Sequence, residues 1–586
     1  ELNLFDDIID DRYSLCNDIG GGDFFNAEND RKSKRQTQSC SYKVYDVSVE
    51  PLKAKCLPGS LCDLVANMLD CANGSPSPSG EDSYHNMSEV RDDLQLMLDK
   101  PTIYLYDQDI GRLSITGLQF GGTVFGRNAE LSTVKDAYRR SVSGGSEMVI
   151  ISGASGSGKS LLVYESRKHM LAGGGIVLSG KFDQLQQGTP FSALASAFDV
   201  YCGTLLEDSG PSSIAGVLAS KLRSSMGRDV HYLTKLIPNL AIILGPETSP
   251  IYHNDDCDNG QKRLLYLLCQ FVDVISSTFS APVTLFLDDL QWADTASIEA
   301  VNNLLITAST SLQDKRFFFL GCCREGEING GHPVWKLLTN LERASVGCTN
   351  IKLDLMDEHT INTMVSETLS LLPRLTRSLS SVIYHKTKGN PLFVSHLMLS
   401  LSKEGLLRPS LSRRRWEWEM KKIEDRELPD DVAMFLNNSI MELPDGVQSS
   451  LCILSCFGAS ADVSLIETLE RALNQNIRDD LDVAVAKGLL DKIGVEYRFS
   501  HDRIQEATYN MMEDGVRRLF HFTYGLSLAS LSIEEECDGI LFMAVNQLNH
   551  GGPSAVEDPS QCFIVADMNL RAGKNAMEMS DFKTAL

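Results

Sequence analysis

The chain is 586 residues long, too long for a single hydrophobic core, so we expect about three to four domains. Hydrophobic residues make up 43% and charged residues 23%, an ordinary composition for a globular protein. Asp and Glu together number 78, Lys and Arg 54, and the net charge is −24. A chain this acidic repels the phosphates of DNA and RNA, so we expect no nucleic-acid partner.

The cysteines and the apolar runs favour a cytoplasmic protein without a membrane span. The fifteen cysteines include no CxxC pair and no Cys/His cluster at zinc spacing, which indicates free thiols in a reducing compartment. No apolar run reaches the roughly eighteen residues that a membrane helix needs, and no signal peptide is visible. The chain starts at Glu1 rather than Met and stops within an expected helix, so we expect both ends to be cuts.

The N-terminal part divides into a polar stretch and two short helices. Residues 1–55 contain "GGGDFF" and "ENDRKSKRQTQ", and we expect a disordered or incomplete lead-in. Within residues 56–108, "LCDLVANMLDC" and "MSEVRDDLQLMLDKP" carry apolar residues three and four apart, which predicts two amphipathic helices, the second ending before Pro101. Two short helices cannot form a core of their own, so we expect them to belong to a domain that begins upstream.

Residues 120–356 alternate apolar runs with amphipathic helical stretches, the pattern of an α/β fold. The runs are "MVIISG", "GIVLSG", "PVTLFLDD", "RFFFLGCC" and "NIKLDLM". They predict a parallel sheet of five strands.

After this region the strand signals nearly vanish. Residues 357–428 predict a helical lid domain. Residues 429–515 contain "AVAKGLLDKIGVEYRFSHDRIQEATY", which predicts a helix, a two-stranded wing and a helix, and so a winged-helix domain. Residues 516–586 are helical again, and "LRAGKNAMEMSDFKTAL" has the small-residue spacing of a tetratricopeptide-like helical repeat, although one copy cannot establish a solenoid.

The stretch "MVIISGASGSGKSLLVYES" carries the spacing of a phosphate-binding loop between a buried strand and a helix. Glycines let backbone N–H groups approach phosphates, and the helix N-terminus adds partial positive charge. Lys159 would reach the β- and γ-phosphates of ATP, and Ser160 would ligate Mg²⁺. The residues expected at the nucleotide are Gly153, Ser155, Gly156, Ser157, Gly158, Lys159 and Ser160.

The stretch "PVTLFLDDLQWAD" places two carboxylates at the end of a buried strand, where ligands bind in α/β folds. We expect Asp288 to hold Mg²⁺ through water and Asp289 to orient the attacking water. Asp294 is interpreted as the N-cap of the following helix. Arg324, which ends "RFFFLGCCR", is the candidate that faces the γ-phosphate, with an exposed strand-end arginine as the alternative.

These motifs occur in a recognisable order together with "VFGRNAEL", "GKFDQLQQGTPFSALASAF", "KGNPLFV" and "YRFSHDRIQEATY". In that order they resemble STAND-type signalling ATPases of the AAA+ superfamily. More narrowly, they resemble the ATPase region of hybrid proteins that join a serine/threonine kinase, this ATPase, helical repeats and often a sensor histidine kinase. The resemblance covers about residues 61–586.

The resemblance implies further nucleotide contacts. In the family, a "hhGRExE" segment before the first strand contacts the adenine; here it is "VFGRNAE", with Asn128 in place of the usual Glu. Phe125, Gly126 and Arg127 are therefore the expected contacts.

Two later segments match family motifs that lie over the nucleotide. "GNP", which ends at Pro391, is similar to a turn of the helical domain that packs on the base, or is an ordinary start of a helix. "SHDR" is similar to the "MHD" segment of NB-ARC switches, whose His contacts the ADP β-phosphate. His501 is therefore the expected clamp, with a buried structural histidine as the equal alternative.

At its N-terminal end the matched region resembles the last helices of a kinase domain. The chain has no HRD, DFG or strand-lysine motif, so we expect no kinase activity in it.

Three functions fit these observations. The first is a switch that binds and slowly hydrolyses ATP, with ATP and ADP favouring different conformations, protein partners bound through helical repeats and nucleotide-dependent self-association. The second is a DNA-associated AAA+ ATPase of the replication-initiator or transcription-activator type, which the net charge disfavours. The third is a scaffold with a degenerate ATP site, which the intact Lys159, Ser160, Asp288 and Asp289 disfavour.

Overall fold

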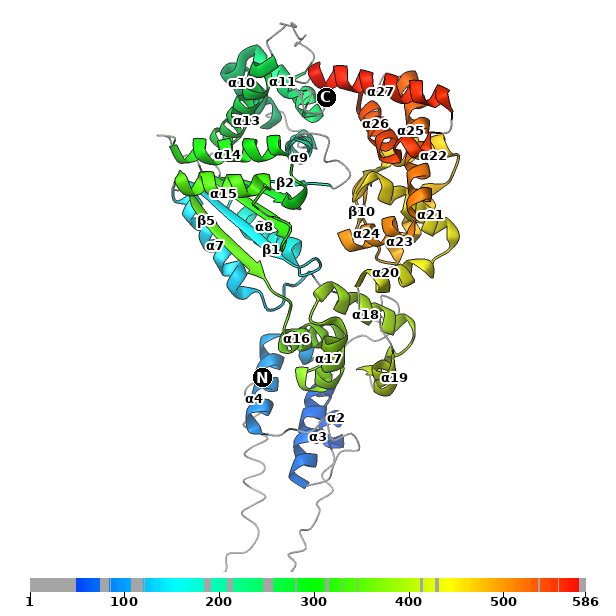
Figure 1. The fold of residues 1–586 in the computed structure, drawn as a ribbon. Coiled ribbons are helices and arrows are strands. Elements are labelled where there is room, and N and C mark those ends of the chain that lie inside the picture. The colour runs from blue at the N-terminus through cyan, green and yellow to red at the C-terminus, as the bar shows by residue number, and fades with distance from the viewer. Residues whose placement is uncertain are drawn as a thin grey trace, which may run out of the picture.

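The fold is taken from a computed structural model (Figure 1). The residues that it describes are 49–73, 84, 86–106, 118, 120, 122–183, 191–207, 214–234, 236–245, 257–279, 282–310, 316–328, 330–344, 346–410, 415–426, 432–535, 538–556 and 558–578. Most of the expected lead-in, residues 1–48, therefore lies outside the described residues, and so do residues 579–586 of the expected repeat.

A five-stranded parallel sheet forms the centre of the ATPase region, as the sequence predicts, with the strand order β2-β3-β4-β1-β5. Its register pairs Gly153 with both Arg324 and Leu353, and Lys181 with Asp288. These residues meet at one edge of the sheet because all the strands end there. The strands are β1 (Gly145–Gly153), β2 (Ile176–Lys181), β3 (Val283–Asp288), β4 (Arg316–Arg324) and β5 (Gly347–Leu353).

Helices cover both faces of this sheet, which explains why its strands read as continuous apolar runs. Successive residues of β1 alternate between two cores: Met148 and Ile150 join one, Val149 and Ile151 the other. The helices are α7 (Asn128–Val142), α8 (Lys159–Ala172), α9 (Ser192–Glu207), α10 (Ile214–Met226), α11 (Val230–Thr234), α12 (Pro238–Leu244), α13 (Cys257–Phe279), α14 (Thr295–Thr310) and α15 (Pro333–Arg343), with the short 3-10 turns η2 (Gly227–Asp229) and η3 (Leu290–Trp292).

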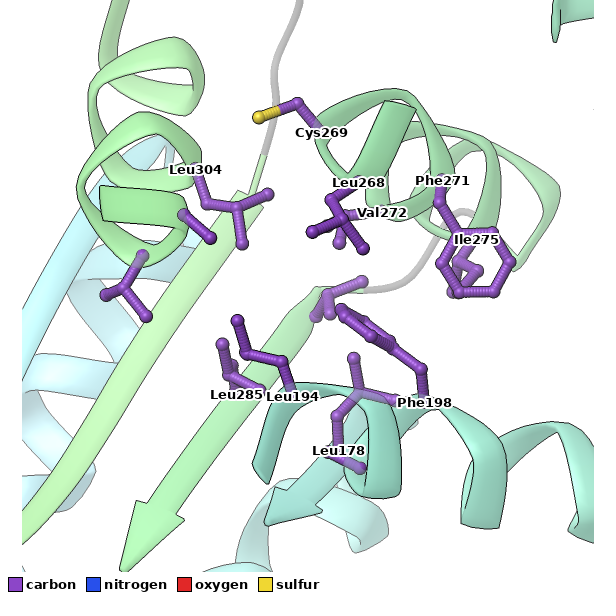
Figure 2. Packing of buried hydrophobic residues seen from close by; sticks show 14 of the residues in the cluster. Leu178, Leu194, Phe198, Leu268, Cys269, Phe271, Val272, Ile275, Leu285 and Leu304 are labelled. Atoms are coloured by element: carbon purple, nitrogen blue, oxygen red, sulfur yellow. The ribbon is translucent and has the colours of Figure 1, made fainter. Parts of the chain in front are cut away.

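The larger core lies between α13, α9 and strands β2 and β3 (Figure 2). Phe271 of α13 meets Phe198 of α9 edge to face, with ring centroids 5.4 Å apart. Leu268, Val272 and Ile275 of α13 are buried in the same cluster (Figure 2). This packing fixes the strands whose ends carry Lys181 and Asp288.

The lid follows β5 and consists of α16 (Glu358–Leu369), α17 (Pro373–Thr387), α18 (Pro391–Lys403) and α19 (Met420–Asp425). It also contains an antiparallel hairpin, β6 (Leu407–Ser410) and β7 (Arg415–Trp418), where the sequence predicts helices alone. The strands have four residues each, too few for a periodic signal to emerge, and the burial of Trp416 and Leu407 holds them on the lid core.

The winged-helix region agrees with the predicted pattern and adds a strand. β9 (Leu490–Ile493) and β10 (Glu496–Phe499) form the expected wing, and β8 (Ser460–Asp462) pairs with the other side of β10. The helices are α20 (Val432–Met441), α21 (Asp445–Phe457), α22 (Val463–Leu473), α23 (Ile477–Ala486) and α24 (Asp502–Met511).

Three further helices share one hydrophobic cluster with the winged-helix region. Gly525 approaches Leu548 while Gly551 approaches Phe522, so the first two of these helices run antiparallel and close together. The elements are α25 (Asp514–Glu535), α26 (Asp538–Gly551), the 3-10 turn η4 (Pro553–Ala555) and α27 (Pro559–Glu578).

The N-terminal helices lie against the lid (Figure 1). The predicted helix that ends before Pro101 is confirmed, because it stops at Asp99, and Pro101 then starts a further turn. The elements are α2 (Glu50–Ala54), α3 (Gly59–Asn73), α4 (Met87–Asp99) and α5 (Pro101–Tyr104). Within the described part of the chain, no helix is long and apolar enough to cross a bilayer.

Candidate functional site

The glycine-rich loop joins β1 to α8 at the carboxyl edge of the sheet. Gly156 and Gly158 have φ angles of +80° and +94°, a region that side chains with a Cβ rarely adopt. At Gly153, a Cβ would lie 2.7 Å from the backbone oxygen of Leu353. Glycine is therefore required at these positions, at Gly156 and Gly158 by the backbone angles and at Gly153 by the close approach of β5.

Lys159 and Ser160 open α8 directly behind this loop. Lys159 is 9% exposed, and its Nζ donates to the carbonyl oxygens of Gly153 and Ala154, at 3.0 Å each. The hydroxyl of Ser160 donates to Asp288 Oδ2 at 2.9 Å. The structure therefore brings together the ammonium, hydroxyl and carboxylate groups that the sequence assigns to phosphate and Mg²⁺.

The two carboxylates that end β3 point to different partners. Asp289 has a φ of +55°, so the chain turns sharply after Asp288. Asp288 Oδ1 accepts a hydrogen bond from the Asp289 backbone N–H at 3.0 Å. Asp289 Oδ1 accepts from Gln291 Nε2 at 2.8 Å. Asp288 thus faces Ser160, and Asp289 faces the neighbouring strand β2.

These side chains fit a magnesium nucleotide. Mg²⁺ prefers oxygen ligands, usually takes one or two protein groups and completes its shell with phosphate oxygens and water. Ser160 and Asp288 supply two such oxygens side by side, next to the loop, where Gly158 faces open space. Among the described residues, no cluster of three or more His, Cys, Asp or Glu side chains could hold a metal alone. A site of this kind depends on the nucleotide for the remaining ligands.

Lys181, the last residue of β2, is a member of the site that the sequence analysis missed. Its Nζ lies 3.2 Å from Asp289 Oδ2 and forms an ion pair and a hydrogen bond with Asp502 at the start of α24. Burial lowers the pKa of Lys181, but Asp502 and Asp289 outweigh burial and raise it. Burial, with the charges of Asp502 and Asp288, raises the pKa of Asp289 to about 7. Lys181 stays charged and ties β2, β3 and α24 together.

Arg324 lies at the same edge, at the end of β4. Its Nη2 is 2.5 Å from Glu506 Oε1 on α24, and its guanidinium lies 4.8 Å from the centre of the Trp292 ring. The side chain is 12% exposed, so the alternative of an exposed strand-end arginine is wrong. Its position agrees with the predicted one, but its partner is a carboxylate of the winged-helix region.

His501 directly precedes α24 and lies close enough to Lys181 and Lys159 for their charges to act on it. Its Nδ1 accepts a hydrogen bond from the Arg503 backbone N–H at 3.1 Å, which makes it the N-cap of the helix. Burial lowers the pKa of His501 to about 4, and Lys181 and Lys159 act in the same direction against Asp502. The imidazole is therefore neutral near pH 7, and it has a structural role as well as a position near the loop.

The lid reaches the phosphate loop through Asn390, which precedes Pro391 at the start of α18. Its Nδ2 donates to the Ser155 carbonyl oxygen at 3.0 Å, and its Oδ1 accepts from the Leu392 backbone N–H. A Cβ on Gly156 would lie 2.7 Å from Asn390 Oδ1. Of the "GNP" turn, the sequence analysis named Pro391 alone, although an Asn before a Pro is a recognisable N-cap signal.

The segment expected at the adenine lies between the sheet and the lid. Gly126 has a φ of +66°, and a Cβ there would lie 2.6 Å from Thr360 Cγ2 of α16. Arg127 is 8% exposed, pairs with Glu130 at 3.2 Å and donates to the backbone oxygen of Asp354. Phe125 packs, half-buried, against the lid core.

The strand-to-lid connection, residues 354–357, is fixed beside this segment. The Met356 backbone N–H donates to the Gly389 carbonyl oxygen at 2.9 Å. Asp357 then caps α16 by accepting from the Thr360 backbone N–H at 2.8 Å.

Asp294, which precedes α14, accepts from the Ser297 backbone N–H at 2.8 Å, so its predicted N-cap role is confirmed.

Residues 123–318 match a protein family described as an AAA ATPase domain. This match confirms the expected ATPase domain, a nucleotide-binding fold that carries the phosphate loop and both carboxylates of β3. Together with the parallel sheet, it confirms the predicted α/β P-loop architecture.

One curated relative is hybrid signal transduction histidine kinase G of Dictyostelium discoideum, 24% identical over an alignment of 488 residues that covers 66% of this chain. The chain spans only 14% of that relative's length. Among solved structures, a signal transduction ATPase with numerous domains and a tetratricopeptide repeat sensor, from Pyrococcus horikoshii, is 14% identical with a TM-score of 0.40, covering 79% of this chain and 55% of that one. The ORC2 protein of Aeropyrum pernix is 13% identical with a TM-score of 0.34, covering 68% and 97%.

Proposed function

We propose that the AAA ATPase domain of this chain works as a signalling switch, in which ATP and ADP favour different positions of the lid and of α24. The observation that carries the proposal is the contact of α24 with the phosphate-loop edge of the sheet. The proposal also includes the site residues and the domain limits that the sequence predicts.

Two acidic side chains of α24 meet two cations of the sheet. Asp502 and Glu506 are four residues apart, so they lie on one face of the helix. Asp502 pairs with Lys181 of β2, and Glu506 with Arg324 of β4. All four side chains are at most 21% exposed. We call this set of four residues the α24 clamp.

A third contact lies two residues beyond Lys181, past the same end of β2. Asp183 Oδ2 accepts a hydrogen bond from the Ala459 backbone N–H, just before β8, at 2.9 Å. The sheet edge therefore holds the winged-helix region at three places, through Lys181, Asp183 and Arg324.

The clamp cations lie at the edge where a triphosphate would bind. A γ-phosphate beside Lys159 would bring negative charge to Arg324 and Lys181 and so compete with Glu506 and Asp502 for them. A ligand shifts an equilibrium only through different contacts in the two states, and this competition supplies such a difference. ATP would then favour release of α24, and ADP, without the γ-phosphate, would favour the clamped form.

The same contacts would make hydrolysis slow. Mg²⁺ held by Ser160 and Asp288 would neutralise phosphate charge and orient the nucleotide. Asp289 is the carboxylate that would orient water, but its two oxygens contact Gln291 and Lys181. Lys181, a member of the clamp, lies beside the carboxylate that would hold the water, so hydrolysis would respond to the state of the clamp. His501, the N-cap of α24, would contact the β-phosphate of ADP while the clamp is closed.

Partner binding through the C-terminal helices also belongs to this proposal. α27 exposes apolar side chains at a seven-residue spacing, a stripe to which a further helix or a protein partner could pack: Phe563, Leu570 and Met577 are 79%, 58% and 54% exposed. Self-association on ATP binding stays a prediction.

The test is the rate at which a fluorescent ADP analogue leaves the protein. The double variant Asp502→Asn, Glu506→Gln keeps the shape of α24 and removes both clamp charges. We expect ADP release to become about tenfold faster, the size of a typical coupling between two sites. Glu513→Gln, an exposed acid between α24 and α25, is the control and should leave the rate unchanged. Unchanged release from the double variant would contradict the clamp.

A further inference from the structure

The N-terminal helices are joined to the lid by a buried polar network. Arg374, near the start of α17, places its Nε 2.9 Å from Asp93 Oδ2 on α4, and both side chains are 7% exposed. The hydroxyl of Tyr84 donates to the same oxygen at 2.9 Å, and the Arg374 guanidinium lies 4.2 Å from the Tyr84 ring centre. We call Tyr84, Asp93 and Arg374 the arm lock, and α3 to α5 the arm.

An apolar layer and a second set of contacts surround this network. Leu372, between α16 and α17, is buried in one cluster with side chains of the arm: Leu64, Tyr84, Val90, Met97 and Tyr104. Lys100 pairs with Glu367 of α16 at 2.5 Å, and the Tyr104 and Ser366 hydroxyls lie 3.2 Å apart. The joint therefore has a buried centre, in which polar side chains are paired with one another, and the Lys100 pair at its rim.

The lid element that holds the arm also leads to the nucleotide site. Arg374 lies near the start of α17, and the turn that follows this helix carries Asn390 to the Ser155 carbonyl oxygen. α17 has fifteen residues and so spans about 22 Å. A packed helix is a rigid element, so a displacement at Asn390 moves Arg374 with it.

We propose that the arm and the lid move as one body, so that the arm passes the nucleotide-dependent position of the lid to whatever part of the protein adjoins it. A buried ion pair suits this role, because a slipped register would leave an unpaired charge inside the joint. The direction of the signal rests on the proposed switch, whereas the rigid joint rests on the arm lock alone.

The experiment measures two distances by spin labels on unnatural amino acids, because the fifteen cysteines preclude simple thiol labelling. One pair joins the arm to the lid, at Leu98 of α4 and Arg377 of α17. The other joins the arm to the sheet region, at Leu98 and Tyr164 of α8. All three positions are exposed.

On exchange of ADP for a non-hydrolysable ATP analogue, we expect the distance between Leu98 and Tyr164 to shift and the distance between Leu98 and Arg377 to stay constant. Arg374→Met should broaden the arm-to-lid distribution, and Lys100→Met, at the rim of the joint, should not. A shift of the arm-to-lid distance as large as that of the arm-to-sheet distance would overturn the proposal.

A separate outcome concerns the switch. If neither distance responds to nucleotide, the proposed switch is wrong. The Arg374→Met variant then still tests whether the joint between arm and lid is rigid. A broadened arm-to-lid distribution in Arg374→Met supports it, and an unchanged distribution overturns it.

Discussion

The arm lock and the α24 clamp are both built from ion pairs between distant parts of the chain, yet their surroundings differ. Asp93 and Arg374 are 7% exposed each and lie inside an apolar cluster, away from the phosphate loop. Lys181 and Arg324 lie at the carboxyl edge of the sheet, where, in the proposed switch, a nucleotide would offer them another anion. A buried pair away from any ligand fastens two elements, whereas a pair beside a charged ligand can be exchanged.

The largest expected effect tests the fastening pair. Arg374→Met leaves Asp93 buried without its cation, and breaking such a pair costs about 3–5 kcal/mol. We expect the free energy of local opening of α4 and α17 to fall by this amount in hydrogen exchange, while the strands of the sheet keep their protection. Lys100→Met removes a pair whose lysine is 45% exposed and whose glutamate is 11% exposed, and it should cost about 1 kcal/mol, less than loss of the buried pair.

A double variant that removes both charges distinguishes the loss of the ion pair from the cost of leaving one buried charge unpaired. In Asp93→Asn, Arg374→Met neither charge is left unpaired, so we expect part of the lost stability to return. A double variant as unstable as the sum of its single changes would mean that the two side chains act independently.

The next effect tests which region responds to nucleotide. Lys159→Ala removes the ammonium expected at the phosphates, and we expect ATP affinity to fall at least about 100-fold, or about 2.7 kcal/mol, in calorimetry. Hydrogen exchange in α4 should remain that of the parent protein, because the arm lock does not involve the loop. Retained ATP affinity would remove Lys159 from the site.

The smallest effect separates two functions of His501. His501→Ala removes both the ring and the N-cap of α24, and loss of a cap costs about 1 kcal/mol. Asn is a good N-cap, so His501→Asn removes the ring alone. We expect ADP to leave both variants a few-fold faster in stopped-flow measurements (of order 0.5–1 kcal/mol). If the Asn variant releases ADP at the parent rate, the histidine acts only as the cap of the helix.

Local patterns predict much of the ATPase core. The apolar runs predict all five strands, because strands covered on both faces are apolar throughout. The strand, loop and helix around Lys159 follow from the glycine spacing, and the position of Asp288 follows from its place at the end of a buried strand.

Contacts across long stretches of sequence leave no such local signal. Lys181 meets Asp502 across 321 residues, and Arg374 meets Asp93 across 281. Each side chain, read alone, is a charged residue at the end of a strand or on a helix, and such residues are usually exposed. Their pairing depends on how the lid and the winged-helix region pack on the sheet, which periodicity does not encode.

The strand-to-lid connection sets how the lid can move. Residues 354–357 span at most about 14 Å when extended. They are held at one end by the bond from Arg127 to Asp354 and at the other by the bond between Met356 and Gly389. So short and doubly tethered a connection allows the lid to turn about a pivot but not to slide away. The segment expected to contact the base, Phe125 to Arg127, lies at this pivot. A base bound there would act next to the axis of rotation, so a small local displacement would correspond to a large displacement at the far end of the arm.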